Sequence, residues 1–216
     1  MKTVIQMKNY ILILSIMFAS LTANACKNCG CRADKKSKSE HKHENDSQSH
    51  ANVDLTESTV YWKGAKLTGS HEGTIDILSA HLHFNDKVFE GGEIIIDMKS
   101  INCTDLSGDS KKNIEGHLKD EDFFFSEEYP TSKLVMGNVK KIGINTYEIE
   151  GDMTIRGITN PIKFKSIMTN GKANAKLKID RTKYGIKYKS KSFIKNIGDK
   201  MIYDEFDLEV NLIYTL

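Results

Sequence analysis

Apolar and polar residues alternate along most of the chain after Thr59. In 147–155, apolar residues and one glycine occupy every second position, and acidic residues and a threonine occupy the positions between. The same period of two recurs in 172–180 and in 203–215. Because strict alternation gives a strand one buried and one solvated face, the pattern predicts antiparallel sheet.

This alternation and the turn residues between its runs predict eight or nine strands. Asn170-Gly171 is the clearest two-residue hairpin turn, and Asn85-Asp86 marks another. Many strands joined by tight turns are typical of a barrel or sandwich, and consecutive hairpins favour the barrel. We therefore expect an all-β fold, an antiparallel barrel of about eight strands, with strands near 59–67, 73–84, 87–98, 132–141, 145–156, 161–169, 172–180, 191–195 and 203–215.

One segment, 107–122, departs from the period of two. Asp109 or Ser110 is suited to cap a helix, and Ile114 and Leu118 lie four residues apart on one helical face. The segment therefore predicts a short helix near 109–121 that interrupts the series of hairpins.

Three consecutive phenylalanines, 123–125, follow this helix in the run GHLKDEDFFFSEEYP. Neither a half-buried strand nor an amphipathic helix places three adjacent apolar residues on one face. We expect the helix to lie across a barrel mouth, with one or two of the rings facing a ligand channel. The alternative is that all three are ordinary core residues.

The first 25 residues have the features of a secretory signal peptide. Lys2 and Lys8 precede an apolar run, 10–21, that is too short to cross a membrane as a helix. The triplet 23–25, Ala-Asn-Ala, fits the small-x-small cleavage pattern. Cys26 follows directly, at the position of the lipid acceptor in bacterial lipoproteins. The sequence thus predicts export, with lipidation of Cys26 and plain secretion as alternatives.

Residues 26–52 are predicted to form a disordered tether before the barrel domain, 53–216. They contain almost no apolar side chains to offset the entropy of ordering. Thiolate and imidazole suit Zn or Cu, so a metal-handling tail is one alternative. A lipidated cysteine beside incidental thiols is the other. The residues concerned are Cys26, Cys29, Cys31, His41, His43 and His50.

The charge balance argues against a nucleic-acid partner. Removal of residues 1–25 takes away two lysines, which lowers the basic count from 31 to 29 against 29 acidic residues. Nucleic-acid binding usually leaves a basic excess, and this chain would have none after cleavage.

Six blocks occur in order along the domain: GSHEGTIDILSAHLHF, GGEIIIDMKSI, GHLKDEDFFFSEEYPTSKL, GDMTIRGITNPIKF, IDRTKYGIKYKS and IGDKMIYDEFDLEV. In sequence and spacing these blocks resemble the YceI-like family, from about residue 54 to 216. The resemblance implies a lipocalin-like antiparallel barrel in the periplasm. It also implies binding of long apolar chains, such as polyisoprenoids, quinones, or fatty acids and their amides.

The predicted inward faces define a candidate lumen for such a chain. An eight-stranded barrel is just wide enough for one small ligand, and Gly92, Gly151, Ala173 and Ala175 are expected to leave the lumen partly empty. Trp62 is alternatively a core residue or a plug at the base. The candidate lipid contacts are Phe123, Phe124, Trp62, Ile94, Ile96, Ile149, Met153, Phe164, Leu177 and Leu208.

Three polar residues are candidates for contact with a lipid head group: His71, Asp180 and Arg181. The planar guanidinium of Arg181 suits a phosphate or quinone oxygen. Structural roles are the alternative, with His71 holding a turn and Asp180 and Arg181 in ion pairs near the barrel end. His117 has the same two interpretations.

Four further residues are predicted to be structural. Arg156 is expected in a solvated turn, and Cys103 is expected to be a buried thiol. His81 and His83 are expected on one strand face with Ile75 and Ile77, and they are interpreted as a water-facing strand end rather than metal ligands.

Together these features favour a non-enzymatic periplasmic carrier of a long-chain hydrophobic small molecule, with no cofactor. An enzyme acting on lipids is less favoured, because the chain has no G-x-S-x-G, P-loop or H-E-x-x-H motif. Membrane attachment would run through Cys26, and a homodimer is left open.

Overall fold

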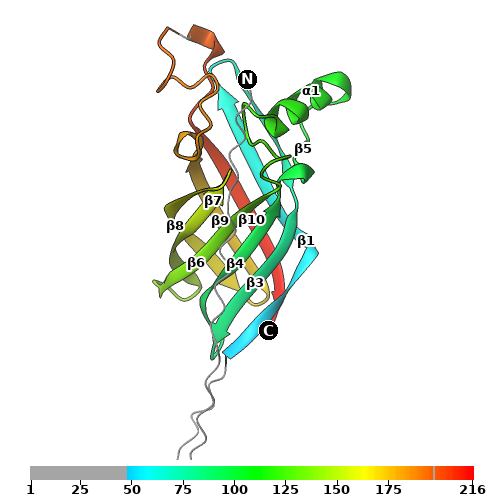
Figure 1. Cartoon of the computed structure of the whole chain (residues 1–216). Coiled ribbons are helices and arrows are strands. Elements are labelled where there is room, and N and C mark those ends of the chain that lie inside the picture. Colours follow the sequence, from blue (N-terminus) through cyan, green and yellow to red (C-terminus); the bar gives the residue numbers. More distant parts are fainter. Residues whose placement is uncertain (1–47, 197) are drawn as a thin grey trace, which may run out of the picture. The chain divides into compact units, whose positions relative to one another are not determined.

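Eight antiparallel strands close into a barrel in the computed structural model, which describes residues 48–196 and 198–216 (Figure 1). Around the barrel the order is β1-β3-β4-β6-β7-β8-β9-β10, and β10 pairs back with β1. The predicted eight-stranded barrel is therefore confirmed. Its strands are β1 (Gln48–Lys66), β3 (Ile77–Asn85), β4 (Val88–Asp97), β6 (Thr131–Lys141), β7 (Thr146–Ile155), β8 (Ile158–Thr169), β9 (Lys172–Asp180) and β10 (Glu205–Thr215).

The first strand is much longer than predicted. β1 begins at Gln48, so residues 48–52, expected in the tether, belong to the barrel. These residues pair with the end of β3, and the side chain of Ala51 is buried opposite Leu82. Residues 48–52 are mostly polar, so the hydrophobic pattern gives no sign that the strand begins there. Residues 1–47, including the predicted signal peptide, lie outside the described residues.

The predicted strand 73–84 is divided at Asp76 into β2 (Gly69–Ile75) and β3. Both halves run antiparallel to β1, which has an irregularity between Asp54 and Thr59. β2 pairs along its whole length with the second half of β1, and its other edge pairs with the two-residue strand β5 (Asn102–Cys103).

A second irregularity corrects the predicted face of two histidines. Ile75 and Ile77 are buried, whereas His81 and His83 are exposed. The register shifts between Ile77 and Ser79, and one extra residue moves the following side chains to the opposite face. The histidines do not share a face with the isoleucines, but they face water as predicted.

The strand predicted at 191–195 is wrong. The backbone N–H groups of Phe193 and Ile194 both donate to the carbonyl of Ser190, so the segment closes on itself as turns. Short 3-10 helices flank it, η2 (Arg181–Tyr184) and η3 (Gly198–Lys200).

The helix α1 (Gly108–Lys119) is confirmed, but it projects from the rim of the barrel instead of crossing the mouth (Figure 1). Ser107 holds the N-cap position, and its side chain makes no capping hydrogen bond, unlike the predicted caps at Asp109 or Ser110. A one-turn 3-10 helix, η1 (Met98–Ser100), joins β4 to β5. Across 48–196 and 198–216, no helix has both the length and the apolar character needed to span a bilayer.

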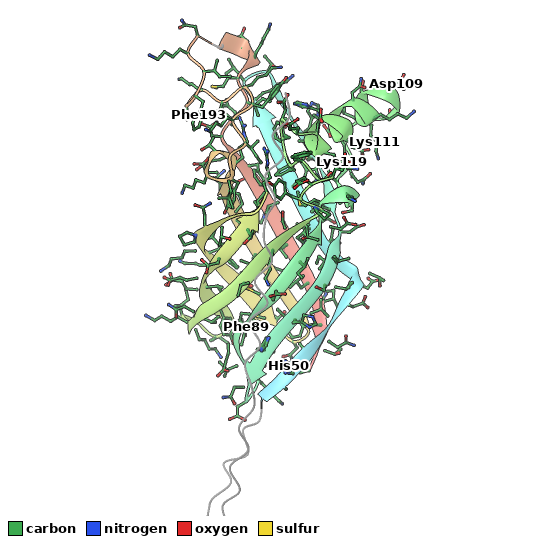
Figure 2. The ribbon with its side chains drawn as sticks, viewed as in Figure 1. His50, Phe89, Asp109, Lys111, Lys119 and Phe193 are labelled. Carbon is green, nitrogen blue, oxygen red and sulfur yellow. The ribbon has the colours of Figure 1, made fainter. Side chains whose placement is uncertain are left out.

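Four aromatic side chains fill the barrel at the end opposite α1. The rings of Phe84 and Phe89 lie 5.4 Å apart, Phe84 also contacts Tyr214 at 5.4 Å, and Phe89 meets Tyr147 at 6.0 Å. All four are buried. We call this cluster the aromatic plug. It closes the base of the barrel, a role that the sequence alone left open for Trp62. Figure 2 labels Phe89 and His50 at this end and Phe193 at the other.

Two glycines allow neighbouring strands to approach closely and do not widen the lumen. A Cβ at Gly92 would lie 2.2 Å from the carbonyl oxygen of His81, and one at Gly151 would lie 2.3 Å from that of Val135. Neighbouring backbone already fills both positions. The expectation that they widen the lumen is therefore wrong, whereas Ala173 and Ala175 do line a cavity.

Candidate functional site

The barrel interior contains an apolar cavity of about 80 Å³ above the aromatic plug. Its wall is almost entirely hydrocarbon, contributed by the inward faces of the strands. Ala173 and Ala175 leave room where larger residues would fill it. Of the predicted lipid contacts, those on this wall are Ile94, Ile96, Ile149, Met153, Phe164, Leu177 and Leu208.

A larger chamber of about 530 Å³ lies at the open end of the barrel. Its wall includes Trp62, Phe123 and Phe124, so all ten predicted contacts line one of the two cavities. Val60, Ile96, Met153 and Leu208 line both, so the inner cavity and the mouth chamber are adjacent, and we call these four side chains the neck. Whether a lipid touches the ten residues stays a prediction.

The three phenylalanines separate because the chain turns sharply at Phe125, which has a left-handed backbone with φ of 48°. Phe123 is buried under the mouth chamber, and Phe124 packs edge-on against Phe206 of β10 at 6.0 Å. Phe125 points elsewhere and contacts Tyr129 at 6.0 Å. Phe123 and Phe124 thus line the mouth chamber and Phe125 does not, while the role of this chamber as a ligand channel stays a prediction.

An aromatic cluster forms one side of the mouth chamber. The ring of His117 from α1 lies 4.5 Å from Tyr188 and 5.3 Å from Phe123. Because His117 joins the helix to these rings, it both positions α1 and lines the chamber. Sequence reasoning missed Tyr188, since it lies between the predicted strands 172–180 and 191–195 and no periodicity marks it.

Arg156 is not a solvated turn residue. It occupies the left-handed turn between β7 and β8, with φ of 52°, and its Nη1 donates a 2.8 Å hydrogen bond to the carbonyl oxygen of Phe123. The side chain therefore ties the phenylalanine segment to the barrel wall.

Arg181 is the most enclosed charged residue at the open end, with only 2% of its surface exposed. Its guanidinium donates to the backbone oxygens of Tyr203, Ile186 and Ile202 at 3.0, 2.9 and 3.1 Å. Burial lowers the pKa of Arg181, and the charges of Asp204 and Asp180 oppose this shift.

These contacts favour the structural interpretation of Arg181, although the residue also touches the mouth chamber. Its Cζ lies 5.5 Å from the centre of the Phe123 ring, which places a cation behind the chamber's aromatic wall. Asp180 caps η2, since its Oδ1 accepts from the N–H and hydroxyl of Thr182 at 2.9 and 2.6 Å.

His71 lies on the chamber rim in a chain of hydrogen bonds. Its Nδ1 is 3.0 Å from Oδ2 of Asp105, and the buried thiol of Cys103 donates to Oδ1 at 3.0 Å. Burial raises the pKa of Asp105, but hydrogen bonds from Cys103, His71 and the N–H of Glu72 outweigh it and hold that pKa at about 2. Burial and the neighbouring Asp105 raise the pKa of Cys103, as expected of a buried thiol.

Lysines add positive charge to the rim. Lys66, Lys189 and Lys200 line the mouth chamber, together with Asp199 and Glu205. Sequence reasoning missed these lysines, because lysines are frequent throughout the chain and their spacing gives no signal.

The candidate metal ligands Cys26, Cys29, Cys31, His41 and His43 lie outside the described residues. His50 lies within them, and its ring meets that of His83 edge-on at 4.8 Å. Among residues 48–196 and 198–216, no group of three or more potential ligands could hold a metal ion.

The model of the YceI-like domain matches residues 52–214. This chain belongs to the YceI-like family. A UPF0312 protein of Pseudomonas putida is 29% identical over 118 residues, and the match spans 54% of this chain and only 56% of that relative. A UPF0312 protein of Pseudomonas fluorescens is 26% identical over 150 residues, across 64% of this chain and 72% of the relative.

Solved structures show the same fold. BcnA of Burkholderia cenocepacia superposes with a TM-score of 0.61 at 19% identity, over 75% of this chain and 99% of its own. A polyisoprenoid binding domain from Saccharophagus degradans gives a TM-score of 0.54 at 12% identity, over 77% and 97% of the two chains.

Proposed function

We propose that the protein is a non-enzymatic carrier that holds one long apolar lipid in its barrel. The observation that carries the proposal is the neck, at which the mouth chamber and the inner cavity share four apolar side chains. A chain that passes the charged rim would meet mostly hydrocarbon from there to the aromatic plug. Burial of each methylene there is favourable by roughly 0.8 kcal/mol.

A polyisoprenoid, a quinone or a fatty acid or amide suits this shape. The mouth chamber, at about 530 Å³, lies within the usual range of small-molecule sites of roughly 300–1,000 Å³. The inner cavity would take the narrow end of the chain. The description of the Saccharophagus degradans domain as polyisoprenoid binding supports the first of these lipids.

The rim would hold the polar end of the ligand. Lys66, Lys189 and Lys200 offer ammonium donors there, and His71 offers an imidazole. A lipid with an anionic or carbonyl-bearing head group would have partners in all four. Arg181 would act from behind the wall, since backbone oxygens occupy most of its donors.

Several contacts support binding over catalysis. Nucleophilic catalysis needs a base within hydrogen-bond reach of the nucleophile. Here the base bonded to the Cys103 thiol is Asp105, whose pKa of about 2 makes it a weak proton acceptor, and the thiol itself has a raised pKa. Such a thiol is a poor nucleophile, because the thiolate is the reactive form.

We further propose that the protein is exported and works in the periplasm, either anchored through Cys26 or released. The apolar run 10–21 and the triplet 23–25 support this. Mass spectrometry of the protein from membrane and soluble fractions of a bacterial host would test it. A diacylglyceryl mass on a chain beginning at Cys26 is expected if it is anchored, and an unprocessed Met1 would contradict export.

Native mass spectrometry of the fragment 44–216 tests the carrier proposal. This fragment holds every described strand and the whole described core. We expect a discrete adduct that organic extraction releases as a prenyl or acyl compound. A bare mass, with no uptake of added ubiquinone or oleamide, would contradict the proposal.

Ala175→Phe provides the matched test of where the ligand lies. Ala175 lines the inner cavity, so a phenyl ring there should fill the cavity, displace the chain and reduce the adduct about tenfold or more. Val135→Phe is the control, because Val135 is exposed on the outer face of the barrel. Equal adduct in both variants would place the ligand outside the lumen.

A further inference from the structure

The segment 187–196 projects from the open end of the barrel. Figure 2 shows Phe193 at this end, opposite Phe89 and the aromatic plug. Phe193 and Ile194 are 50% and 43% exposed, although they are adjacent large apolar residues. Single exposed apolar residues are ordinary, but two neighbours at a projecting tip form a patch that calls for a partner.

The exposure is built into the local structure. Ser190 is fully buried and anchors the segment, because its carbonyl accepts from Phe193 and Ile194 and its backbone bridges to Ile202. The N–H of Ser192 donates to the Ser190 hydroxyl, and the Ser192 hydroxyl donates to Asp204 at 2.5 Å. These bonds hold Phe193 and Ile194 outward. The two side chains could not turn into the core unless these hydrogen bonds broke.

Positive charge predominates within the segment, although Asp204 lies against Ser192 at its base. Residues 187–196 contain Lys187, Lys189, Lys191 and Lys195 and no acidic residue. The ammonium of Lys187 lies 4.8 Å from the centre of the Phe193 ring, so charge and apolar surface share one face. Side chains that combine an apolar stem with a charged tip suit the interface between water and lipid.

We propose that the segment 187–196 docks the open end of the barrel onto an anionic lipid surface. Phe193 and Ile194 would enter the head-group layer, and the lysines would contact lipid phosphates, as juxtamembrane basic clusters do. Tyr188 and Lys189 belong to the same segment and line the mouth chamber. Docking therefore brings the mouth against the bilayer, where an apolar chain could pass without crossing water.

Other charges at the open end limit the orientation. The segment after α1 carries acidic residues at 120–122, and α1 itself carries three lysines against Asp109 and Glu115. An anionic surface would repel the acidic run. In this proposal the segment 187–196 contacts the lipid surface, and the segment after α1 faces away from it.

Flotation of the fragment 44–216 with lipid vesicles tests the docking. This fragment is used because the apolar run 10–21 would bind vesicles by itself. Vesicles of phosphatidylethanolamine and phosphatidylglycerol should bind it, and vesicles of phosphatidylcholine alone should bind it at least about tenfold less. Raising the salt from about 0.1 M to 1 M should release it, because the Debye length falls from about 10 Å to 3 Å.

The double variant Phe193→Ser/Ile194→Ser should lower the affinity for the anionic vesicles about tenfold. Ile144→Ser is the matched control and should bind as the wild type does. Ile144 is 88% exposed in the turn between β6 and β7, beside the aromatic plug residue Tyr147. Equal binding by the wild type and the double variant would overturn the proposal, as would no binding to anionic vesicles.

A second copy of the chain is the competing occupant of the patch. Sedimentation velocity without lipid should show the same monomeric species for the wild type and the double variant. A wild-type dimer that the double variant loses would assign the patch to self-association and overturn the docking proposal.

Two variants distinguish a failure of the docking proposal from a failure of the carrier proposal. Ala175→Phe alters only the inner cavity, so it should keep full vesicle binding while losing the lipid adduct. The double variant should keep the adduct and lose vesicle binding. An adduct without docking would leave the carrier proposal intact.

Discussion

Two of the three adjacent phenylalanines line the mouth chamber, because single residues fix the backbone around them. Phe125 takes the left-handed conformation that turns its ring away, and Arg156 holds the carbonyl of Phe123. Sequence periodicity does not register either feature, since one is a single left-handed residue and the other is a contact between residues 33 positions apart.

Arg156→Gln should therefore loosen the phenylalanine segment. A hydrogen bond from a charged donor is typically worth about 1.5–3 kcal/mol, so we expect urea unfolding to show a loss of roughly 1–2 kcal/mol for this partly buried bond. Lys165→Gln on the exposed face of β8 is the control and should change stability by less than about 0.5 kcal/mol. Similar losses in the two variants would mean that the bond does not anchor the segment.

Asp105 should make stability depend on pH. Its pKa is about 2 in the folded protein against 3.8 ordinarily, so its contribution is present above pH 3.8 and is lost as the pH falls toward 2. With allowance for its partial exposure, we expect this contribution to be roughly 1–2 kcal/mol.

Urea unfolding of the wild type and Asp105→Asn measures this contribution. The variant should be less stable at about pH 6, and the difference should shrink as the pH approaches 2. A difference that stays constant over this range would show that the carboxylate charge is not the source.

At the scale of elements, close approach of strands depends on glycine. Gly92→Ala should cost about 1–3 kcal/mol or more, because the added methyl would meet the His81 carbonyl at 2.2 Å and force β3 and β4 apart. Gly137→Ala in β6 is the matched control, since a Cβ there has no neighbour within 4 Å. Denaturant unfolding would separate the two, and equal losses would point to backbone propensity instead.

Most strands were predictable because their two faces differ in polarity. β7 and β9 each bury one set of alternate residues, so period two located them directly. The failures lie where this contrast is missing. The first residues of β1 are mostly polar, and the Lys-rich segment 191–195 alternates weakly without any partner strand.

The site was predictable to a similar extent. Residues on the inward faces of strands fell on the cavity walls because the barrel closes as expected. Tyr188, Lys189 and Lys200 were missed, because irregular segments bring them to the mouth and no period marks such residues. The aromatic plug was missed for another reason, since its four members come from three hairpins that meet only in space.

At the scale of the whole molecule, the lumen exists because the sheet closes on itself through the pairing of β1 with β10. β1 joins both β3 and β10, so it is the strand that converts a curved sheet into a barrel. Its first residues lie beside the aromatic plug, where Ala51 pairs with Leu82 and Val53 pairs with Tyr214. Without these residues the plugged end would have unpaired strand edges.

A fragment that begins at residue 53 should therefore be less stable than the fragment 44–216. It lacks the pairing of 48–52 with β3, including the buried Ala51, and exposes the backbone of 81–85. We expect a loss of about 2–4 kcal/mol by urea unfolding, from one buried side chain and several cross-strand pairs. Hydrogen exchange should rise first at the amides of 81–85 and leave those of β7 and β8 protected. Equal stability and equal exchange would mean that the barrel closes fully without its first residues, as a tether boundary at 52 would require.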